Sequence, residues 1–579
     1  MGDNADEIRR RKQRWEETTL RKGVERLKLE HSPTRFFTPL DVGDFDFLKK
    51  VGFPGEYPFT SGTYATMAWS GGEKGTGDIT QVPGLVRAGR YSGYGTPEDT
   101  YVYYRQMQEM GQRGGPNLAF DLPTQCGYDS DNPTVTGEVG KVGVSIDSLK
   151  DFEIIYDAFK GESDLDKIAS NFTINAPVNI IMAMYIALAQ KRGIALEKLR
   201  ATPQNDILKE YTARGTYIFP PKPAMRMFRD SLVFFTKYLP GVNITSFGGY
   251  HMREAGATRE QDLAFSLSNG IAYLQTGIDA GLDIDSFAPR FSSAGFGGTV
   301  EFFKEIALAR AARRMWAKIL KEQFGAKNPR SMLLRPPMTV HLGYSTATKQ
   351  RPLNNLTRSI IAGIACAVSS GPPMCFPPYD EALGLGWSLE ALQLQEDADR
   401  ILQHEAKLTE VIDPLAGSYY VESLTDEIEQ AAWEEIAKIQ KMGGAVVAIE
   451  NGYMQRQIAR SAYEYQKRVE RREALIVGLN CFTGEHELEV LPSRLVPHPY
   501  DPRKREEAEA KQVANLTHLK KNRDNHEVTR YLNELKTAAR KEDENLIPYF
   551  IDCAKAYVTI QEMCDVLRDI FGEYQPVSS

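Results

Sequence analysis

Between about residue 115 and residue 410, short segments typical of β-strands alternate with longer segments that have the pattern of amphipathic helices. The expected helices include 178–192, 258–281 and 299–323, and the strand candidates are Leu118–Leu122, Asn171–Asn175, Ala201–Gln204, Asn243–Phe247, Ser286–Arg290, Met332–Arg335 and Ala367–Ser370. Repeated strand–helix units of this length predict a parallel sheet in an α/β protein. Their number and span favour a closed (β/α)8 TIM barrel over an open sheet.

The strand candidates carry small polar residues where a barrel interior is usually filled by branched apolar side chains. Thr173, Asn175, Thr245 and Ser246 are the examples. If these residues face inward, they leave a hydrophilic bore in which a long polar ligand can lie. If they belong to strand ends and loops, no bore follows. The sequence alone supports both interpretations equally.

The chain divides into three expected regions. Residues 1–50 form an N-terminal helical arm, residues 51–420 form the barrel with its entry loops, and residues 421–579 form a C-terminal helical region. A Gly-rich insertion at 70–78 precedes the barrel, and a Pro-rich stretch at 492–502 interrupts the C-terminal helices.

Composition excludes several classes of partner. The net charge of −7 gives no reason to expect nucleic acid or an acidic membrane surface. The short basic run Arg9–Lys12 is balanced by nearby acids and is typical of a solvated helix or a subunit-contact arm. We find no signal peptide and no apolar stretch long enough to span a membrane. The six cysteines form no C-x-x-C pair, which indicates reduced thiols in a cytoplasmic protein and no metal site.

Two segments carry residues suited to ligand chemistry. Residues 203–221 read PQNDILKEYTARGTYIFPP and contain Arg214, whose forked guanidinium matches a planar carboxylate. Residues 248–257 read GGYHMREAGA and place Tyr250 and His251 directly after a strand candidate, where catalytic side chains of barrels project. Taken alone, Arg214 is more typical of a surface ion pair, and the Tyr-His pair is more typical of satisfied core residues.

These two segments indicate a family more specifically when they are taken together with other sequence blocks that occur in the same order. With the blocks at 118–140, 286–316 and 411–422 (VIDPLAGSYYVE), they resemble the methylmalonyl-CoA mutase family over roughly residues 50–570. The resemblance implies an isomerase that uses adenosylcobalamin to rearrange the carbon skeleton of an acyl-CoA by a radical route. No paired carboxylates or Ser-His-Asp arrangement stands out, as expected if the cofactor supplies the difficult step.

The resemblance also implies roles for individual residues. Arg214, with Tyr91, corresponds to the residues that hold a free carboxylate of the substrate, and Arg214 also lies toward the cofactor. Tyr250 corresponds to the tyrosine that wedges against the adenosyl group. His251 corresponds to the hydrogen-bond donor to the thioester carbonyl, and Gln204 is its polar neighbour at the acyl group.

Further positions match contacts of the family with lower specificity. Phe120 and Leu122 correspond to residues over the corrin ring, and Glu254 and Glu381 to glutamates near the deoxyadenosyl group. The substrate-binding set implied by the resemblance is completed by Arg290, Thr202, Ser292, Ser293, Ala294 and Gln125. Each of these residues can instead have an ordinary packing or ion-pair role.

Departures from the family pattern concern the substrate pocket. Gln125 replaces a pocket histidine, and Ser293-Ala294 replace two successive phenylalanines. The pattern is also lost at 336–343 and 372–379. The lost bulk favours a substituted succinyl-CoA or malonyl-CoA as substrate. Methylmalonyl-CoA mutase activity proper and a non-catalytic CoA-binding subunit are the alternatives. A 2-hydroxyisobutyryl-CoA mutase fits less well, since such enzymes place an acid at Ala119 and Ile at Tyr91.

One expected motif is missing from the sequence. In this family an Asp-x-His-x-x-Gly loop supplies the histidine that binds cobalt, and no such pattern occurs among the 579 residues. The resemblance therefore implies a large catalytic subunit that works with a separate small cobalamin-binding subunit in a hetero-oligomer.

Overall fold

The computed structural model describes residues 2–26, 28, 36–43, 45–65, 67, 92–109, 114–161, 163–335, 340–371, 377–383, 388–484 and 502–576. Tyr91, the Gly-rich insertion at 70–78 and residues 336–339 and 372–376 lie outside this set. Among the residues described, no helix combines the length and the apolar character needed to cross a bilayer.

Six parallel strands form the centre of the molecule. The strands are β1 (Asn117–Ala119), β2 (Ala169–Thr173), β3 (Arg200–Pro203), β4 (Thr245–Gly248), β5 (Phe291–Gly298) and β6 (Val340–Leu342). They pair in chain order as two three-stranded sheets. Backbone hydrogen bonds from Asn243 N to Ala201 O (2.8 Å) and from Ser246 N to Gln204 O (2.7 Å) join the sheets between β3 and β4. The predicted parallel α/β arrangement is confirmed. Three of the strand candidates, Ser286–Arg290, Met332–Arg335 and Ala367–Ser370, are helical or irregular in the structure and are not strands.

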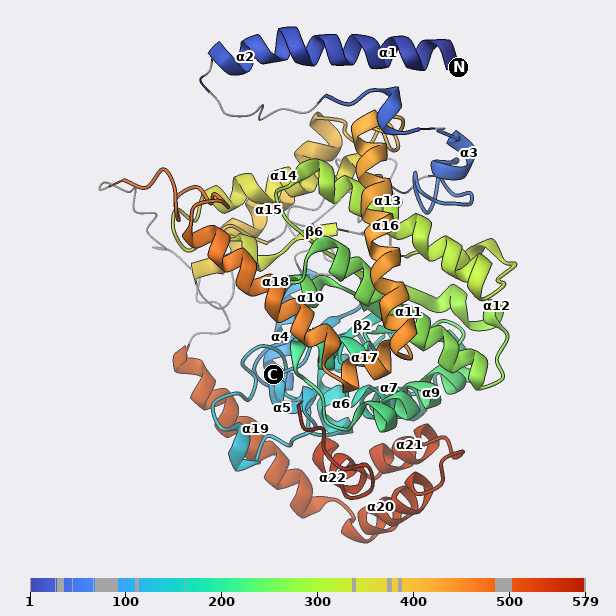
Figure 1. The fold of residues 1–579 in the computed structure, drawn as a ribbon. Helices are drawn as coiled ribbons and strands as arrows, with labels where there is room; N and C mark the ends of the chain where they lie inside the picture. Colours follow the sequence, from blue (N-terminus) through green and yellow to red (C-terminus); the bar gives the residue numbers. More distant parts are fainter. Residues whose placement is uncertain are drawn as a thin grey trace.

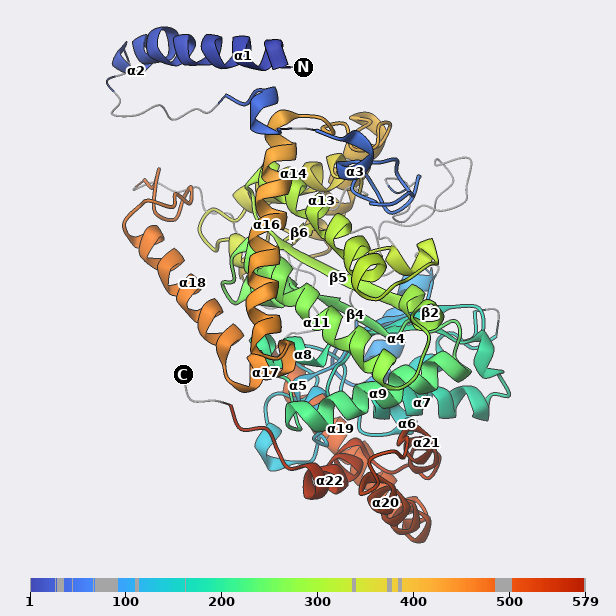
Figure 2. The ribbon, with the colours of Figure 1, turned by 45° about the vertical axis from the view of Figure 1, so that its right-hand side comes forward.

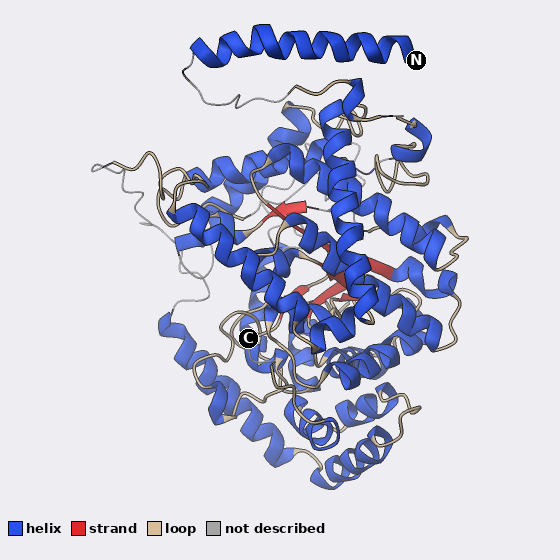
Figure 3. Cartoon of the chain, viewed as in Figure 1, coloured by secondary structure: helices blue, strands red, loops and turns tan. Residues whose placement is uncertain are grey.

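Helices follow the strands and surround them (Figure 3). The helices between and after the strands are α6 (Leu149–Asp157), α7 (Val178–Lys191), α9 (Pro221–Tyr238), α11 (Arg259–Asp279), α13 (Phe302–Lys318) and α14 (Asn354–Val368). The strand pairing found among the described residues does not close into a ring: β1 has a further parallel bridge to Ser92, and β6 ends the array on the other side.

The two faces of the strands differ in polarity. In β2, Ser170 and Phe172 are buried, and Ser170 accepts a hydrogen bond from Tyr156 of α6, so this face lies against the helices. Asn171 and Thr173 alternate with them and are half-buried on the other face. The same pattern continues across the sheet, because Asn171 is in register with Asn117 of β1 and Thr202 of β3.

This alternation partly settles whether the polar strand residues line a hydrophilic bore or belong to strand ends and loops. Thr173 and Ser246 lie on the half-buried inner face, as a hydrophilic bore requires. Asn175 lies beyond the end of β2, and Thr245 is buried with its hydroxyl donating to the Gln204 and Asn205 carbonyls. The first pair therefore belongs to the inner face, and the second pair to a strand end and to the helix-facing side.

The terminal regions lie at opposite ends of the molecule. Helices α1 (Gly2–Trp15) and α2 (Arg21–Arg26) lie apart from the main body in both views (Figures 1 and 2). The C-terminal helices that pack at the other end are α19 (Pro502–Asn522), α20 (Asn525–Ala539), α21 (Ile547–Lys555) and α22 (Ile560–Phe571). Between them, α16 (Tyr419–Met442), α17 (Ala445–Glu450) and α18 (Tyr453–Glu470) run along the side of the body.

Helix α13 fixes α16 to the sheet through buried arginines. Arg310 is fully buried and pairs with both Asp413 and Glu422, the latter at 2.5 Å. One turn further, Arg314 pairs with Asp426 at 2.7 Å and with Glu429. Buried charges are tolerated only when they are paired, so this helix and its acidic partners must assemble together.

We expect Arg310→Met to lower the free energy of unfolding by about 3–5 kcal/mol, because it leaves two buried carboxylates without their cation. Urea denaturation followed by circular dichroism measures the change. The matched control is Lys304→Met on the same helix, whose pair with Glu301 is exposed; it should cost at most about 1 kcal/mol. Equal effects of the two variants would contradict this account.

Candidate active site

The candidate site lies where several strands end. Asn175 follows β2 and Gln204 follows β3, so both side chains lie at the C-terminal edge of the sheet. Directly after Gln204, the chain forms the short helix α8 (Ile207–Lys209) and the π-helical turn Glu210–Arg214, which return over the same edge. Parallel strands place the residues that follow them side by side, and this edge is where barrel enzymes carry their chemistry.

Glu210 is the centre of a hydrogen-bonded network at this edge. Its carboxylate is buried and accepts from Asn175, from Lys209 at 2.9 Å, and from the backbone N–H and hydroxyl of Thr216 at 3.0 and 2.6 Å. Arg214 Nη1 lies 3.3 Å away. Burial alone would raise the pKa of Glu210, but the charges of Lys209 and Arg214 hold it below its ordinary value.

Arg214 connects this network to the surface of the edge. Its Nη1 donates to Gln125 Oε1 at 2.5 Å and to Thr216 Oγ1 at 3.0 Å. The side chain of Arg214 is 21% exposed to solvent. Gln125 is itself held by a bond from its Nε2 to the Phe120 carbonyl at 2.6 Å. One nitrogen of the guanidinium is therefore fixed, while the residue remains accessible to a ligand.

The turn before Tyr250 requires two glycines because there is no space for a side chain at either position. A Cβ on Gly248 would lie 2.5 Å from the Gly295 carbonyl oxygen, and a Cβ on Gly249 would lie 1.4 Å from a carboxylate oxygen of Asp262. The turn is therefore pressed directly against β5 and α11. The close approach of backbone in this position is possible only without side chains.

Tyr250 and His251 begin α10 (Tyr250–Glu254) immediately after this turn. Both are half-buried, and their rings meet edge to face with centroids 5.3 Å apart. Helix α10 packs against β5 and against the π-helical turn that carries Arg214. The structure therefore brings the Tyr-His pair to the same edge of the sheet as Gln204 and Arg214.

Comparison with known proteins identifies the family. A sequence profile described as methylmalonyl-CoA mutase matches residues 28–573. The 2-hydroxyisobutanoyl-CoA mutase large subunit of Aquincola tertiaricarbonis is 37% identical over 96% of this chain and 94% of its own length. The methylmalonyl-CoA mutase of Escherichia coli is 37% identical over 92% of this chain and 70% of its own length, and the human mitochondrial enzyme is 36% identical over 90% and 66%. The chain belongs to the methylmalonyl-CoA mutase family.

The glutamates matched to the family's deoxyadenosyl contacts differ in their surroundings. Glu254 ends α10 and accepts from the backbone N–H and the hydroxyl of Ser345, at 2.9 and 3.0 Å. It ties α10 to the segment after β6, and Gly343 leaves room for it. Glu381 lies farther along the chain, and burial, with the neighbouring Asp380, raises its pKa to about 7.

The residues matched to family substrate contacts on the strands divide between the two faces. Thr202 lies on the inner face and accepts from the Asn243 amide at 2.8 Å. Ser292 is in register with Ser246 and donates to the Thr245 carbonyl. Ala294 is half-buried, two residues further on the same strand.

Ser293 has a different position. It is buried and in register with Phe247, whose ring packs against Trp316 of α13 at 4.8 Å. Register partners in a parallel sheet point to the same side, so Ser293 faces the helices. Of the two positions that depart from the family's phenylalanines, Ala294 is the one placed toward the inner face.

Three further residues that correspond to ligand contacts of the family lie away from the hydrogen-bonded network around Glu210. Arg290 precedes β5 at the opposite, N-terminal edge, where its Nη1 donates to the carbonyls of Phe235 and Leu239 at 2.8 and 3.1 Å. Phe120 is fully buried against Phe172, so a contact of its ring with a cofactor would require this packing to open. Leu122 follows β1 at the C-terminal edge and is 37% exposed. Tyr91 lies outside the described residues.

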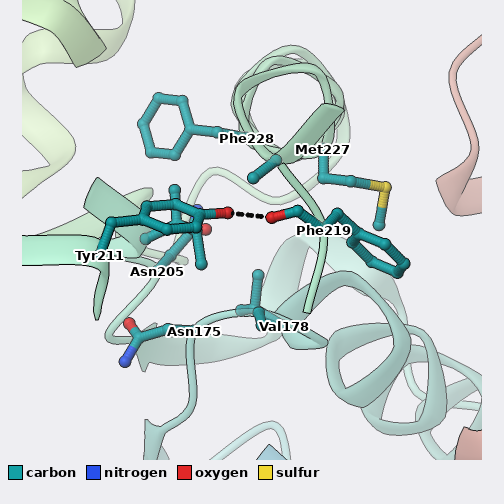
Figure 4. A pocket seen from close by; sticks show the side chains of 10 residues that line it. Asn175, Val178, Asn205, Tyr211, Phe219, Met227 and Phe228 are labelled. Atoms are coloured by element: carbon teal, nitrogen blue, oxygen red, sulfur yellow. Dashed lines mark hydrogen bonds between the residues drawn. The ribbon is translucent and has the colours of Figure 1, made fainter. Parts of the chain in front are cut away.

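A small cavity lies behind the network, between the strand ends and α9 (Figure 4). Asn175 and Asn205 line one side, and apolar side chains such as Val178 and Phe228 line the rest. Tyr211 crosses it and donates to the Phe219 carbonyl at 2.5 Å. Its lining is largely apolar and the charged groups of the network do not enter it, so it is a packing feature behind the site. No group of three potential metal ligands occurs in the part of the chain that is described.

Sequence reasoning missed the residues that hold the site together. Asp206, Lys209 and Glu210 were not singled out, although all three lie within the QNDILKEYTAR segment that carries Gln204 and Arg214, and Asn175 was noted only as a polar strand residue. The available signal was the density of polar residues directly after a strand candidate. Such residues are usually solvated, and only the structure places them in a buried cluster.

We expect Asp262→Asn to change how stability depends on pH. Burial raises the pKa of Asp262 to about 7, opposed by the charge of Arg253 and by the backbone N–H of Gly297. Between about pH 4 and pH 7 the folded chain keeps a proton that the unfolded chain releases, so stability from this group is lost as pH rises. Relative to the variant, the wild type should lose on the order of 3–4 kcal/mol from about pH 4 to pH 8.

Chemical denaturation at a series of pH values measures this difference. Asp279→Asn serves as the control, because Asp279 is an exposed carboxylate on the same helix. Its profile should run parallel to that of the wild type. Parallel profiles for Asp262→Asn and the wild type would show that Asp262 does not titrate in this range.

Proposed function

We propose that this chain is the large subunit of an adenosylcobalamin-dependent acyl-CoA mutase. The reaction is the reversible 1,2-exchange of a thioester carbonyl group with hydrogen on a carboxylated acyl-CoA. The observation that carries the proposal is the joint placement of Arg214 and Gln204 around one buried carboxylate, with His251 at the same edge. This set offers a guanidinium for a carboxylate and neutral donors for a carbonyl. Membership of the family supports the reaction.

The acyl-CoA lies, in this proposal, along the inner face of the strands, which close into the (β/α)8 barrel of the family. The support is the row of small, half-buried polar residues on that face, formed by Asn117, Asn171 and Thr202 in register. Arg290 lies at the N-terminal edge of the second sheet, directly before β5, where a phosphate group of CoA can meet it. Polar side chains of small volume leave room for a chain and satisfy its amides.

The residues at the C-terminal edge fit the expected cofactor. Leu122 offers exposed apolar surface there, Tyr250 a half-buried aromatic ring, and Glu254 a carboxylate for hydroxyl groups. When bound, adenosylcobalamin supplies the carbon-centred radical chemistry that the amino acids themselves lack. The protein residues position the acyl group, donate to its carbonyl and exclude water.

The proposed partner of the chain is a cobalamin-binding subunit. We infer that cobalt is bound by a separate small subunit. The name of the Aquincola relative, a large subunit that aligns over 94% of its length, supports this division.

The proposed substrate is a substituted succinyl-CoA or malonyl-CoA. Arg214 accounts for the free carboxylate, and Ala294 on the inner face leaves space that a larger acyl group can fill. Ala119 lies in β1 on the same face and offers no acid, which sets this chain apart from the pattern of hydroxyacyl-CoA mutases.

We expect the purified chain with adenosylcobalamin to show no turnover, and the addition of a small cobalamin-binding subunit to restore it. The reason is the missing cobalt ligand. Conversion of carboxylated acyl-CoAs is followed by chromatography of the CoA esters. Full activity of the chain alone would contradict the two-subunit proposal, and no activity of the complex on any carboxylated acyl-CoA would favour a non-catalytic CoA-binding subunit.

Arg214→Gln tests the same site within the active complex. The variant should lower kcat/KM for the carboxylated substrate by at least about a hundredfold, since a charge-assisted pair is lost in a partly buried place. Arg330→Gln on an exposed turn serves as the control and should leave kcat/KM unchanged.

We expect Ala294→Phe to shift the preference of the complex toward methylmalonyl-CoA, because the added ring fills the space intended for a larger acyl group. Competition between methylmalonyl-CoA and substituted succinyl-CoA esters measures the preference. Ala294→Val is the matched smaller change and should give a partial shift. A wild-type complex that prefers methylmalonyl-CoA to every larger ester would show that the pocket is not enlarged.

A further inference from the structure

We propose that Lys209 is a positioning residue that fixes the amide of Gln204, so that its N–H group and not its oxygen faces the ligand. The inference deepens the proposed function and rests on it. Lys209 does not touch the ligand in this proposal. It acts through Gln204, and Glu210 acts as the counter-ion that allows a charged lysine in this place.

The first step is the orientation of the Gln204 side chain. Its Oε1 accepts from Lys209 Nζ at 2.9 Å and from Asn175 Nδ2 at 2.8 Å. A lysine ammonium has three donors and no acceptor. The end of the amide that meets it must therefore be the oxygen, which removes the usual ambiguity between the two ends of a glutamine.

The second step is the orientation of Asn175. Its Nδ2 also donates to Glu210, and its Oδ1 accepts from the backbone N–H of Asp206 at 2.8 Å. An ionised carboxylate only accepts, so Asn175 must turn its nitrogen toward Glu210 and Gln204. Both donors to the Gln204 oxygen are thus set by charged or backbone groups, and none of them can reverse without breaking a second bond.

The third step concerns the buried charges. The side chain of Lys209 is 1% exposed and that of Glu210 is fully buried. Burial lowers the pKa of Lys209, and the neighbouring Glu210 opposes this effect. A buried lysine of this kind is costly unless it has a task or a partner. Here the pair satisfies the oxygen of Gln204, and the nitrogen of that amide has no acceptor among the described residues.

The consequence is a fixed donor beside Arg214. Glu210 binds both Lys209 and Arg214, so one carboxylate sets the position of the amide donor and of the guanidinium. An acyl-CoA with a thioester carbonyl and a free carboxylate presents an acceptor to each. Substitution of Lys209 should not change the affinity for a ligand that lacks the carbonyl.

The test uses this difference. Binding to the full-length chain is measured by calorimetry for two probes, succinyl-CoA and its thioether analogue, in which a methylene replaces the thioester carbonyl. Lys209→Met should weaken binding of the thioester by about tenfold and change binding of the thioether by less than about twofold. Gln204→Ala should give the same pattern, and the double variant should lose no more than either single variant.

Two further variants separate positioning from stability. Gln204→Glu keeps the pair with Lys209 but replaces the N–H donor, so it should fold normally and weaken only the thioester probe. Lys318→Met is the control, since Lys318 pairs with the buried Glu429 at 2.6 Å outside the network and should affect neither probe. Thermal denaturation confirms that each variant is folded.

The outcomes are distinct. Equal weakening of both probes by Lys209→Met, or additive effects of Lys209→Met and Gln204→Ala, would overturn the positioning role and leave the proposed function standing. Wild-type chain that binds neither probe more tightly than free CoA would overturn both. Selective loss of the thioester in Lys209→Met, Gln204→Ala and Gln204→Glu supports the inference.

Discussion

The site depends on one buried carboxylate. Glu210 lies out of water at the edge of the sheet, and the cost of burying its charge is offset only because lysine, arginine, asparagine and threonine groups all donate to it. These donors come from the end of β2, from α8, and from the π-helical turn and the residues that follow it. The need to satisfy Glu210 therefore holds the strand ends, α8 and the π-helical turn in one arrangement, and the ligand-facing groups inherit that order.

Much of this architecture was predictable from the sequence. The alternation of strands and helices followed from periodicity, and Tyr250 and His251 lie directly after a strand as the Gly-Gly pattern indicated. Which face a residue occupies was not predictable, because one step along a strand reverses it. Ser293 and Ala294 are neighbours in the sequence, yet the first faces the helices and the second the inner side. The buried network was missed for a related reason: composition does not tell whether a lysine and a glutamate after a strand are solvated or enclosed.

The outer helices explain how an edge with so little apolar material stays in place. A parallel sheet is usually stabilised by branched residues on both faces, but here the inner face carries small, half-buried polar residues. The stabilisation comes from the side that faces the helices. There Phe172, Phe247 and Trp316 pack in the core, and arginines of α13 form ion pairs with acidic residues of α16. In the proposed function, the strands can leave their inner side to a ligand because their outer side is anchored by packing and by buried ion pairs.

The distribution of chemical groups also bears on the proposed division of the enzyme between two chains. The edge offers donors for a carboxylate and a carbonyl, together with aromatic and apolar surface, and the described residues hold no cluster that can bind a metal ion. Such a site can hold and orient an acyl group, and in the proposed function the cofactor supplies the chemistry of the rearrangement. Reactive carbon radicals must be shielded from water and thiols. In the proposed function, the second subunit covers this polar edge and so shields the reacting groups.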